Sequence, residues 1–74
     1  MQLPQINETG YILRCYTGHW HIRSGRISEI IAKPDGSLSV CIFGVCRGRW
    51  GEKVFPTFQE AVQALEERRI LREN

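Results

Sequence analysis

The fold of this chain is decided by the stretch Phe55-Pro56-Thr57-Phe58-Gln59-Glu60-Ala61-Val62-Gln63-Ala64-Leu65, where an extended, glycine-rich chain gives way to a helix. Thr57 and Glu60 have the S/T-x-x-E spacing of a capping box. In such a box the threonine hydroxyl accepts a hydrogen bond from the backbone N–H three residues on, and the glutamate reaches back to the cap. We therefore predict that a helix begins after Thr57.

The helix is predicted to run from about residue 58 to residue 71 and to be amphipathic. Its apolar side chains recur at the spacing of one helix face and are Phe58, Ala61, Val62 and Leu65. Such a short stripe covers only part of one sheet face. We therefore expect the other face of the sheet to stay in contact with water or to meet a partner.

The chain before the helix has the pattern of short antiparallel strands. Aromatic and β-branched runs occupy residues 11–16, 20–23, 26–32 and 38–43, and residues 52–55 form one more short extended piece. Turn signals separate them at Thr17-Gly18 and Pro34-Asp35-Gly36, with a turn or bulge at Ser24-Gly25. We predict an α+β fold in which a three- to four-stranded antiparallel sheet precedes one C-terminal helix packed on one face. Residues 11–74 form this single small domain, and residues 1–10 are expected to be a flexible N-terminal arm.

The composition is that of a small globular protein. The chain has 74 residues, of which 42% are hydrophobic and 24% charged, and its formal net charge is +2. No apolar run approaches the roughly 18 residues of a membrane span, and the first residues lack the pattern of a signal peptide. We expect a cytoplasmic protein without a membrane partner, whose three cysteines are reduced thiols and not a disulfide framework.

Basic side chains are concentrated in the predicted sheet. Residues 1–55 carry seven basic and four acidic side chains, whereas residues 56–74 carry three basic and four acidic ones. Guanidinium groups contact phosphates and guanine edges, and a two-stranded ribbon can enter the major groove. Together with Tyr16 and His21, the candidate nucleic-acid-binding residues are Arg14, Arg23, Arg26, Arg47, Arg49, Trp50 and Lys53.

Residues 18–67 resemble a known family of DNA-binding domains. The resemblance is carried by Gly18-His19-Trp20-His21-Ile22, Pro34-Asp35-Gly36, Arg49-Trp50-Gly51 and Val54-Phe55-Pro56-Thr57-Phe58-Gln59-Glu60-Ala61. These segments are similar to the arm-type domain at the N-terminus of phage integrases and to the related plant ethylene-response DNA-binding domain. The resemblance implies a sheet that enters the DNA major groove, with contacts from Arg23, Arg26, Arg47, Arg49 and Trp50.

The sequence offers residues for three other kinds of site. A zinc site would have to combine Cys15, His19, His21, Cys41 and Cys46, but Cys41 and Cys46 are predicted to point to opposite faces of a strand. Cys15 with a nearby histidine could act as a nucleophile, although no orienting third group is evident. Gly44, Gly48 and Gly51 match neither the Walker A motif nor the dinucleotide-binding fingerprint, so no phosphate-binding loop is expected. We therefore expect no metal, no cofactor and no enzymatic activity.

The alternative to DNA binding is a protein-binding surface. An uncovered sheet face carrying Ile12, Tyr16, Phe43 or Trp50, or a helix end carrying Ile70 and Leu71, could bind a second copy or another protein. The sequence thus predicts a non-catalytic binding module for double-stranded DNA. The alternative is a small phage or bacterial regulatory protein that acts through protein contacts or as a homodimer.

Overall fold

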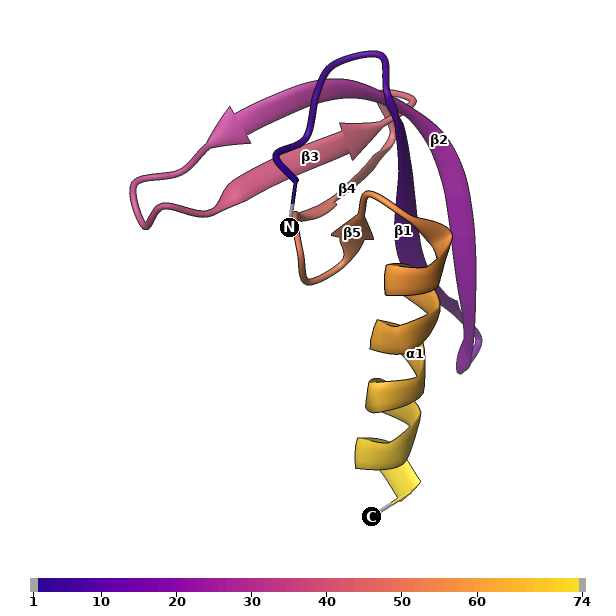
Figure 1. Ribbon diagram of the computed structural model, residues 1–74. Coiled ribbons are helices and arrows are strands. Elements are labelled where there is room, and N and C mark those ends of the chain that lie inside the picture. Colours follow the sequence, from indigo (N-terminus) through magenta and orange to yellow (C-terminus); the bar gives the residue numbers. More distant parts are fainter. Residues whose placement is uncertain (1, 74) are drawn as a thin grey trace.

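The computed structural model describes residues 2–73, with side chains described for residues 2–68. Five strands precede one helix. Their bounds are β1 Thr9–Tyr16, β2 His19–Ala32, β3 Leu38–Ile42, β4 Cys46–Arg49, β5 Val54–Phe55 and α1 Phe58–Glu73. The strands form one antiparallel sheet in the order β4-β3-β2-β1-β5 (Figure 1). The predicted α+β class is confirmed, but the sheet has five strands where three or four were predicted, because the two short pieces β4 and β5 both pair.

The long strand β2 connects the two halves of the sheet. Its first part pairs with β1 from His19 to Arg26, and its second part pairs with β3 from Ile27 to Ala32. The expected turn or bulge at Ser24-Gly25 was wrong, because Gly25 pairs with Gly10 inside the strand. The register shifts instead between Ile27 and Glu29, where the strand passes from one partner to the other.

The sheet curls so that both of its faces contribute to a core. Inside the curl lies a cluster of buried side chains, Ile12, Ile27, Val40, Ile42 and Val54. The opposite face buries Leu13 and Phe55 against Ala61 of α1. The expectation that the face away from the helix stays open was therefore wrong, because the curled sheet covers that face itself (Figure 1). Successive residues of β1 and β5 supply the two cores because side chains alternate along a strand.

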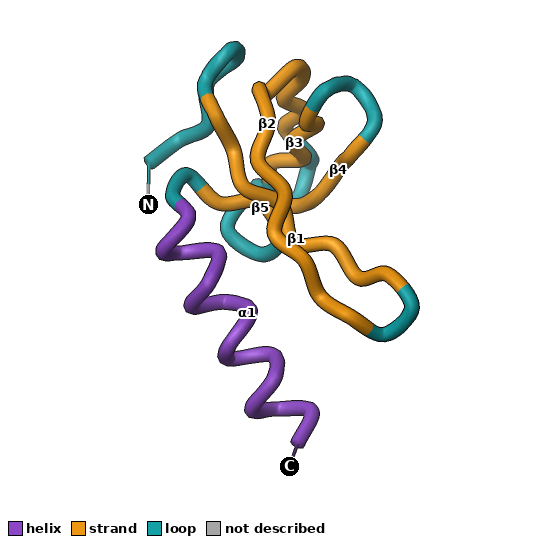
Figure 2. Tube along the Cα trace, turned by 90° about the vertical axis from the view of Figure 1, so that its right-hand side faces the viewer, coloured by secondary structure: helices purple, strands orange, loops and turns teal. Residues whose placement is uncertain are grey.

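Helix α1 begins where the capping box predicts. The backbone N–H of Glu60 donates to Thr57 Oγ1 at 3.2 Å, and the same hydroxyl donates to the Glu60 carboxylate at 2.9 Å. Glu60 thus binds the cap hydroxyl and not the cap N–H. The helix ends two residues beyond the predicted end and lies beside the β1–β2 hairpin (Figure 2).

The buried face of α1 differs from the predicted stripe. Ala61 is fully buried, and Ala64 and Leu65 pack against the same cluster. Phe58 is 55% exposed and touches Tyr11 edge-on, because it sits in the first turn at the rim of the sheet. The predicted contacts of Ile70 and Leu71 lie outside the described side chains.

The segment before β1 lies against the sheet. Asn7 N donates to Ile27 O at 2.9 Å, Trp50 Nε1 donates to Gln2 O at 2.8 Å, and Pro4 is buried. Strand β1 begins at Thr9 and so includes the last two residues of the predicted N-terminal arm, residues 1–10. The flexibility of that arm stays a prediction. Within residues 2–73, no helix is long and apolar enough to cross a membrane.

Candidate nucleic-acid interface

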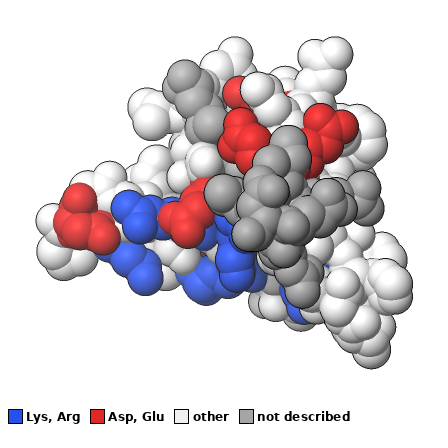
Figure 3. Space-filling view, turned by 90° about the horizontal axis from the view of Figure 1, so that it is seen from below, with Lys and Arg blue, Asp and Glu red and all other residues white. Residues whose placement is uncertain are grey.

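Basic side chains gather on one side of the molecule, between the β2–β3 hairpin and α1 (Figure 3). They line two shallow hollows that share Arg47. One, of about 340 Å³, is lined by Lys33, Arg47 and Arg49, and the other, of about 420 Å³, by Arg14, Arg47 and Lys53. We call these residues the basic band, and its members are Arg14, Lys33, Arg47, Arg49 and Lys53.

Strand β4 aims two members of the basic band outward. Arg47 pairs with Cys41 and Arg49 with Ser39, so both arginines lie on the face opposite the inner core. Between them, Gly48 pairs with the core residue Val40. A Cβ on Gly48 would lie 3.0 Å from Lys53 Cβ, so the glycine lets the β4–β5 turn approach the strand closely. Lys53 N also donates to Arg49 O at 2.9 Å, and Lys53 lines one hollow together with Arg47.

The β2–β3 turn positions Lys33. Lys33 N donates to Ser37 O at 2.9 Å and Gly36 N donates to Lys33 O at 3.0 Å, with Gly36 at a φ of 87°. Asp35 Oδ1 accepts from Ser37 Oγ at 2.6 Å and from Ser37 N at 2.9 Å, and these bonds lower the pKa of Asp35. The predicted turn at Pro34-Asp35-Gly36 is confirmed, and the hairpin that it closes projects from the body of the sheet (Figure 1).

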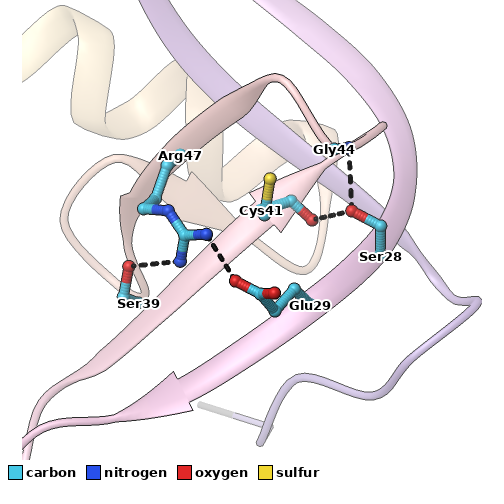
Figure 4. A network of polar contacts seen from close by, with 6 residues as sticks. All are labelled: Ser28, Glu29, Ser39, Cys41, Gly44 and Arg47. Atoms are coloured by element: carbon cyan, nitrogen blue, oxygen red, sulfur yellow. Dashed lines mark hydrogen bonds and ion pairs between the residues drawn. The ribbon is translucent and has the colours of Figure 1, made fainter.

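Two of the arginines already have acidic partners. Glu29, Cys41 and Arg47 form one row across β2, β3 and β4, and an ion pair joins Arg47 to Glu29 across Cys41 (Figure 4). Arg47 also donates to Ser39 Oγ at 3.4 Å. The hydrogen bond to Glu29 raises the pKa of Arg47. Arg49 lies 3.6 Å from Glu52, and the side chains of both pairs are about half exposed.

Arg14 reaches the basic band from β1. Its Nη1 donates to Cys46 Sγ at 2.7 Å, and its guanidinium lies 5.2 Å from the centroid of the Tyr16 ring. Tyr16 in turn lies 5.8 Å from the His21 ring, so Arg14, Tyr16 and His21 form a basic and aromatic patch on one face of the β1–β2 hairpin. All three residues are among the nucleic-acid-binding candidates that the sequence predicts.

The other predicted residues do not join the basic band. Arg23 lies on β2, where it pairs with Ile12 of β1. Arg26, also on β2, lines a separate hollow together with Phe43. Trp50 is half-buried against the inner core, with its Nε1 bonded to the N-terminal segment. Lys33 was missed by sequence reasoning, although its place directly before the Pro34-Asp35-Gly36 turn indicates that it lies at a hairpin tip.

The cysteines and histidines do not form a metal site among the described residues, where no three His, Cys, Asp or Glu side chains come together. Cys41 lies opposite Arg47 on the outer face, whereas Cys46 pairs with the core residue Ile42. Cys15 is exposed and pairs with Trp20, while His21 lies opposite Arg14 on the other face of the hairpin.

Neither a protein-family model, nor a curated protein, nor a solved structure matches this chain.

Proposed function

We propose that this protein is a non-catalytic, cytoplasmic module that binds double-stranded DNA through the basic band. The observation that carries the proposal is that two hollows sharing Arg47 are lined by five cationic side chains, which come from β1, the β2–β3 turn, β4 and the β4–β5 turn. The resemblance of residues 18–67 to integrase arm-type domains supports the same partner. The alternative, a small phage or bacterial regulatory protein that acts through protein contacts or as a homodimer, stays a prediction.

The projecting β2–β3 hairpin gives the DNA contact a geometry. A B-DNA major groove is about 12 Å wide and admits a two-stranded ribbon. With the hairpin in the groove, Lys33 lies near its tip, and Arg47 and Arg49 lie on the neighbouring strand, where phosphates pass. Contacts of this kind to phosphates fix the position of a protein on the duplex.

The ion pairs in the basic band do not prevent phosphate binding. Exposed ion pairs contribute about 0–1 kcal/mol, because water and salt screen them. The Arg47–Glu29 and Arg49–Glu52 pairs are exposed in this sense. A DNA phosphate can therefore replace either carboxylate as the partner of its arginine.

A salt titration with duplex DNA tests the proposal. If about four cations contact phosphates, the logarithm of the affinity should fall against the logarithm of salt with a slope of about −3.6. Raising salt from about 50 to about 200 mM then weakens binding roughly 150-fold. Fluorescence anisotropy with a labelled duplex measures this slope. A missing signal at about 50 mM salt would contradict the proposal.

Matched variants locate the contact surface. Arg49→Ala should weaken binding and make the slope less negative by about 1, because one phosphate contact is lost. Arg23→Ala removes the same charge outside the basic band and serves as the control, with an unchanged slope. Equal effects of the two variants would show that net charge alone, and not the basic band, accounts for the binding.

A further inference from the structure

A third hollow lies at the bend of β2, beside the β3–β4 turn and apart from the basic band. Its volume is about 520 Å³, within the roughly 300–1,000 Å³ range of small-molecule sites. It shares no residue with the basic band. The side chains that line it include Asn7, Thr9, Ser24, Arg26, Ser28 and Phe43.

The β3–β4 turn holds an aromatic ring at the rim of this hollow. Phe43 is 67% exposed and has a φ of 54°, a conformation that favours glycine. Phe43 and Gly44, the latter at a φ of 72°, form a two-residue turn that Val45 N closes by donating to Ile42 O at 3.2 Å, and hairpin turns of this length commonly have positive φ at both central residues. A second non-glycine residue with positive φ, Asn7 at 74°, lines the same hollow.

Neighbouring groups fix the position of the turn. Ser28 Oγ accepts from Gly44 N at 2.8 Å and donates to Cys41 O at 3.2 Å (Figure 4). A Cβ on Gly25 would lie 2.5 Å from Phe43 Cε2, so the ring packs against bare backbone of β2. The ring is therefore held in place while most of its surface faces solvent.

A cation without an acidic partner lines the same hollow as the ring. Arg26 pairs with Thr9 in the sheet, and its backbone carbonyl accepts from Phe43 N at 3.1 Å, so the two residues are neighbours in the strand pairing. Among the described residues, Arg26 forms no ion pair, and no acidic side chain lines the hollow. The remaining wall offers the hydroxyl groups of Thr9 and Ser24 and the amide of Asn7.

We propose that this hollow binds a small anion that carries a flat ring, of the class of nucleoside monophosphates. The ring stacks on Phe43, which is exposed and fixed, and stacking on an aromatic side chain tolerates any base. The phosphate accepts hydrogen bonds from Arg26, whose fork of donors suits phosphate oxygens. The hydroxyl and amide groups of the wall suit ribose hydroxyls and ring heteroatoms. The site is independent of the basic band and of its proposed partner.

Titration of ¹⁵N-labelled protein with adenosine 5′-monophosphate tests the proposal. The expected amide shifts fall on residues 7, 9, 24–28 and 43, and adenosine or inorganic phosphate alone should bind more weakly. Shifts confined to residues 33, 47 and 49 would overturn it, because they would indicate phosphate on the basic band. Inorganic phosphate that binds as tightly as the nucleotide would overturn the role of the ring.

Two variants separate binding from folding. Phe43→Gly removes the ring while supplying the residue that its φ favours, so the fold should hold while nucleotide affinity falls at least about fivefold. Arg26→Gln should lower affinity by a similar factor, and Arg23→Gln, an exposed arginine of the same strand outside the hollow, should leave it unchanged. Unchanged affinity in the folded Phe43→Gly variant would overturn the proposal.

Discussion

At Thr57 one hydroxyl group serves two partners. It accepts from the N–H of Glu60 and donates to the Glu60 carboxylate, so it satisfies a helix N-terminal donor that has no partner within the helix. Glu60 also places its negative charge in the first helical turn, where the helix dipole favours it. The Thr57 side chain therefore fixes where α1 begins.

The first prediction concerns this cap. Thr57→Ala should lower the free energy of unfolding by about 1 kcal/mol, because the Glu60 N–H loses its partner. Thr57→Ser keeps the hydroxyl and should cost much less. Urea denaturation followed by circular dichroism measures both, and equal stability of the alanine variant and the original protein would contradict the capping role.

At the scale of elements, the β2–β3 hairpin depends on a bonded carboxylate at its tip. Asp35 is exposed, and its pKa lies below the ordinary value of 3.8 chiefly because Ser37 Oγ donates to it, with a second bond from Ser37 N. A carboxylate whose pKa is lower in the folded state contributes stability above its unfolded pKa. That contribution is lost as pH falls through the folded pKa.

The hairpin therefore predicts a pH dependence. Asp35→Asn should be less stable than the original protein at neutral pH, and the difference should disappear as pH falls below 3.8. Denaturation series at several pH values check this. Ser37→Ala is the control, since it removes the largest cause of the pKa shift and should reduce the same pH dependence. A stability difference that is constant with pH would contradict the assignment.

For the whole molecule, two small cores share one sheet. The inner core has Trp50 packed against it, and the core beneath α1 has Trp20. Arg68 ties these regions together, because it donates to Glu52 O at 2.8 Å and lies 5.3 Å from the centroid of the Trp20 ring. The two cores are therefore expected to unfold together.

Single-tryptophan variants test this cooperativity. Trp20→Phe leaves Trp50 as the reporter of the inner core and removes a buried Nε1 that has no partner among the described residues. Trp50→Phe leaves Trp20 as the reporter of the helix-side core. In each variant, the fluorescence midpoint should coincide with the midpoint by circular dichroism, as two-state unfolding requires. Separate midpoints in either variant would show that the cores unfold independently.

The sequence could predict the features that depend on local chemistry. The capping box located the start of α1, and Pro34-Asp35-Gly36 located the hairpin turn, because these residues set their own backbone conformation. Each of these signals lies within a few residues of the feature that it predicts.

Features that depend on distant contacts could not be predicted. Ser24-Gly25 has the composition of a turn but lies within β2. A glycine is needed there because Ile42 and Phe43 occupy the space that a side chain at position 25 would fill. The curl of the sheet follows β2, which pairs with β1 along its first part and with β3 along its second, and no local pattern encodes this change of partner. For the same reason the sequence could not separate Arg23 and Arg26 from the basic band.

The two-residue strand β5 has a consequence for folding kinetics. Val54 completes the inner core and Phe55 the helix-side core, so neither core is whole until β5 pairs with β1. The other pairings join strands that are neighbours in sequence. The pairing of β1 with β5 must close a long loop, and the loss of chain entropy precedes the contacts that compensate for it. The hairpins can therefore form early, whereas both hydrophobic clusters are completed only in a later step, when β5 pairs with β1. In stopped-flow refolding, the two tryptophan reporters should accordingly show the same rate-limiting phase.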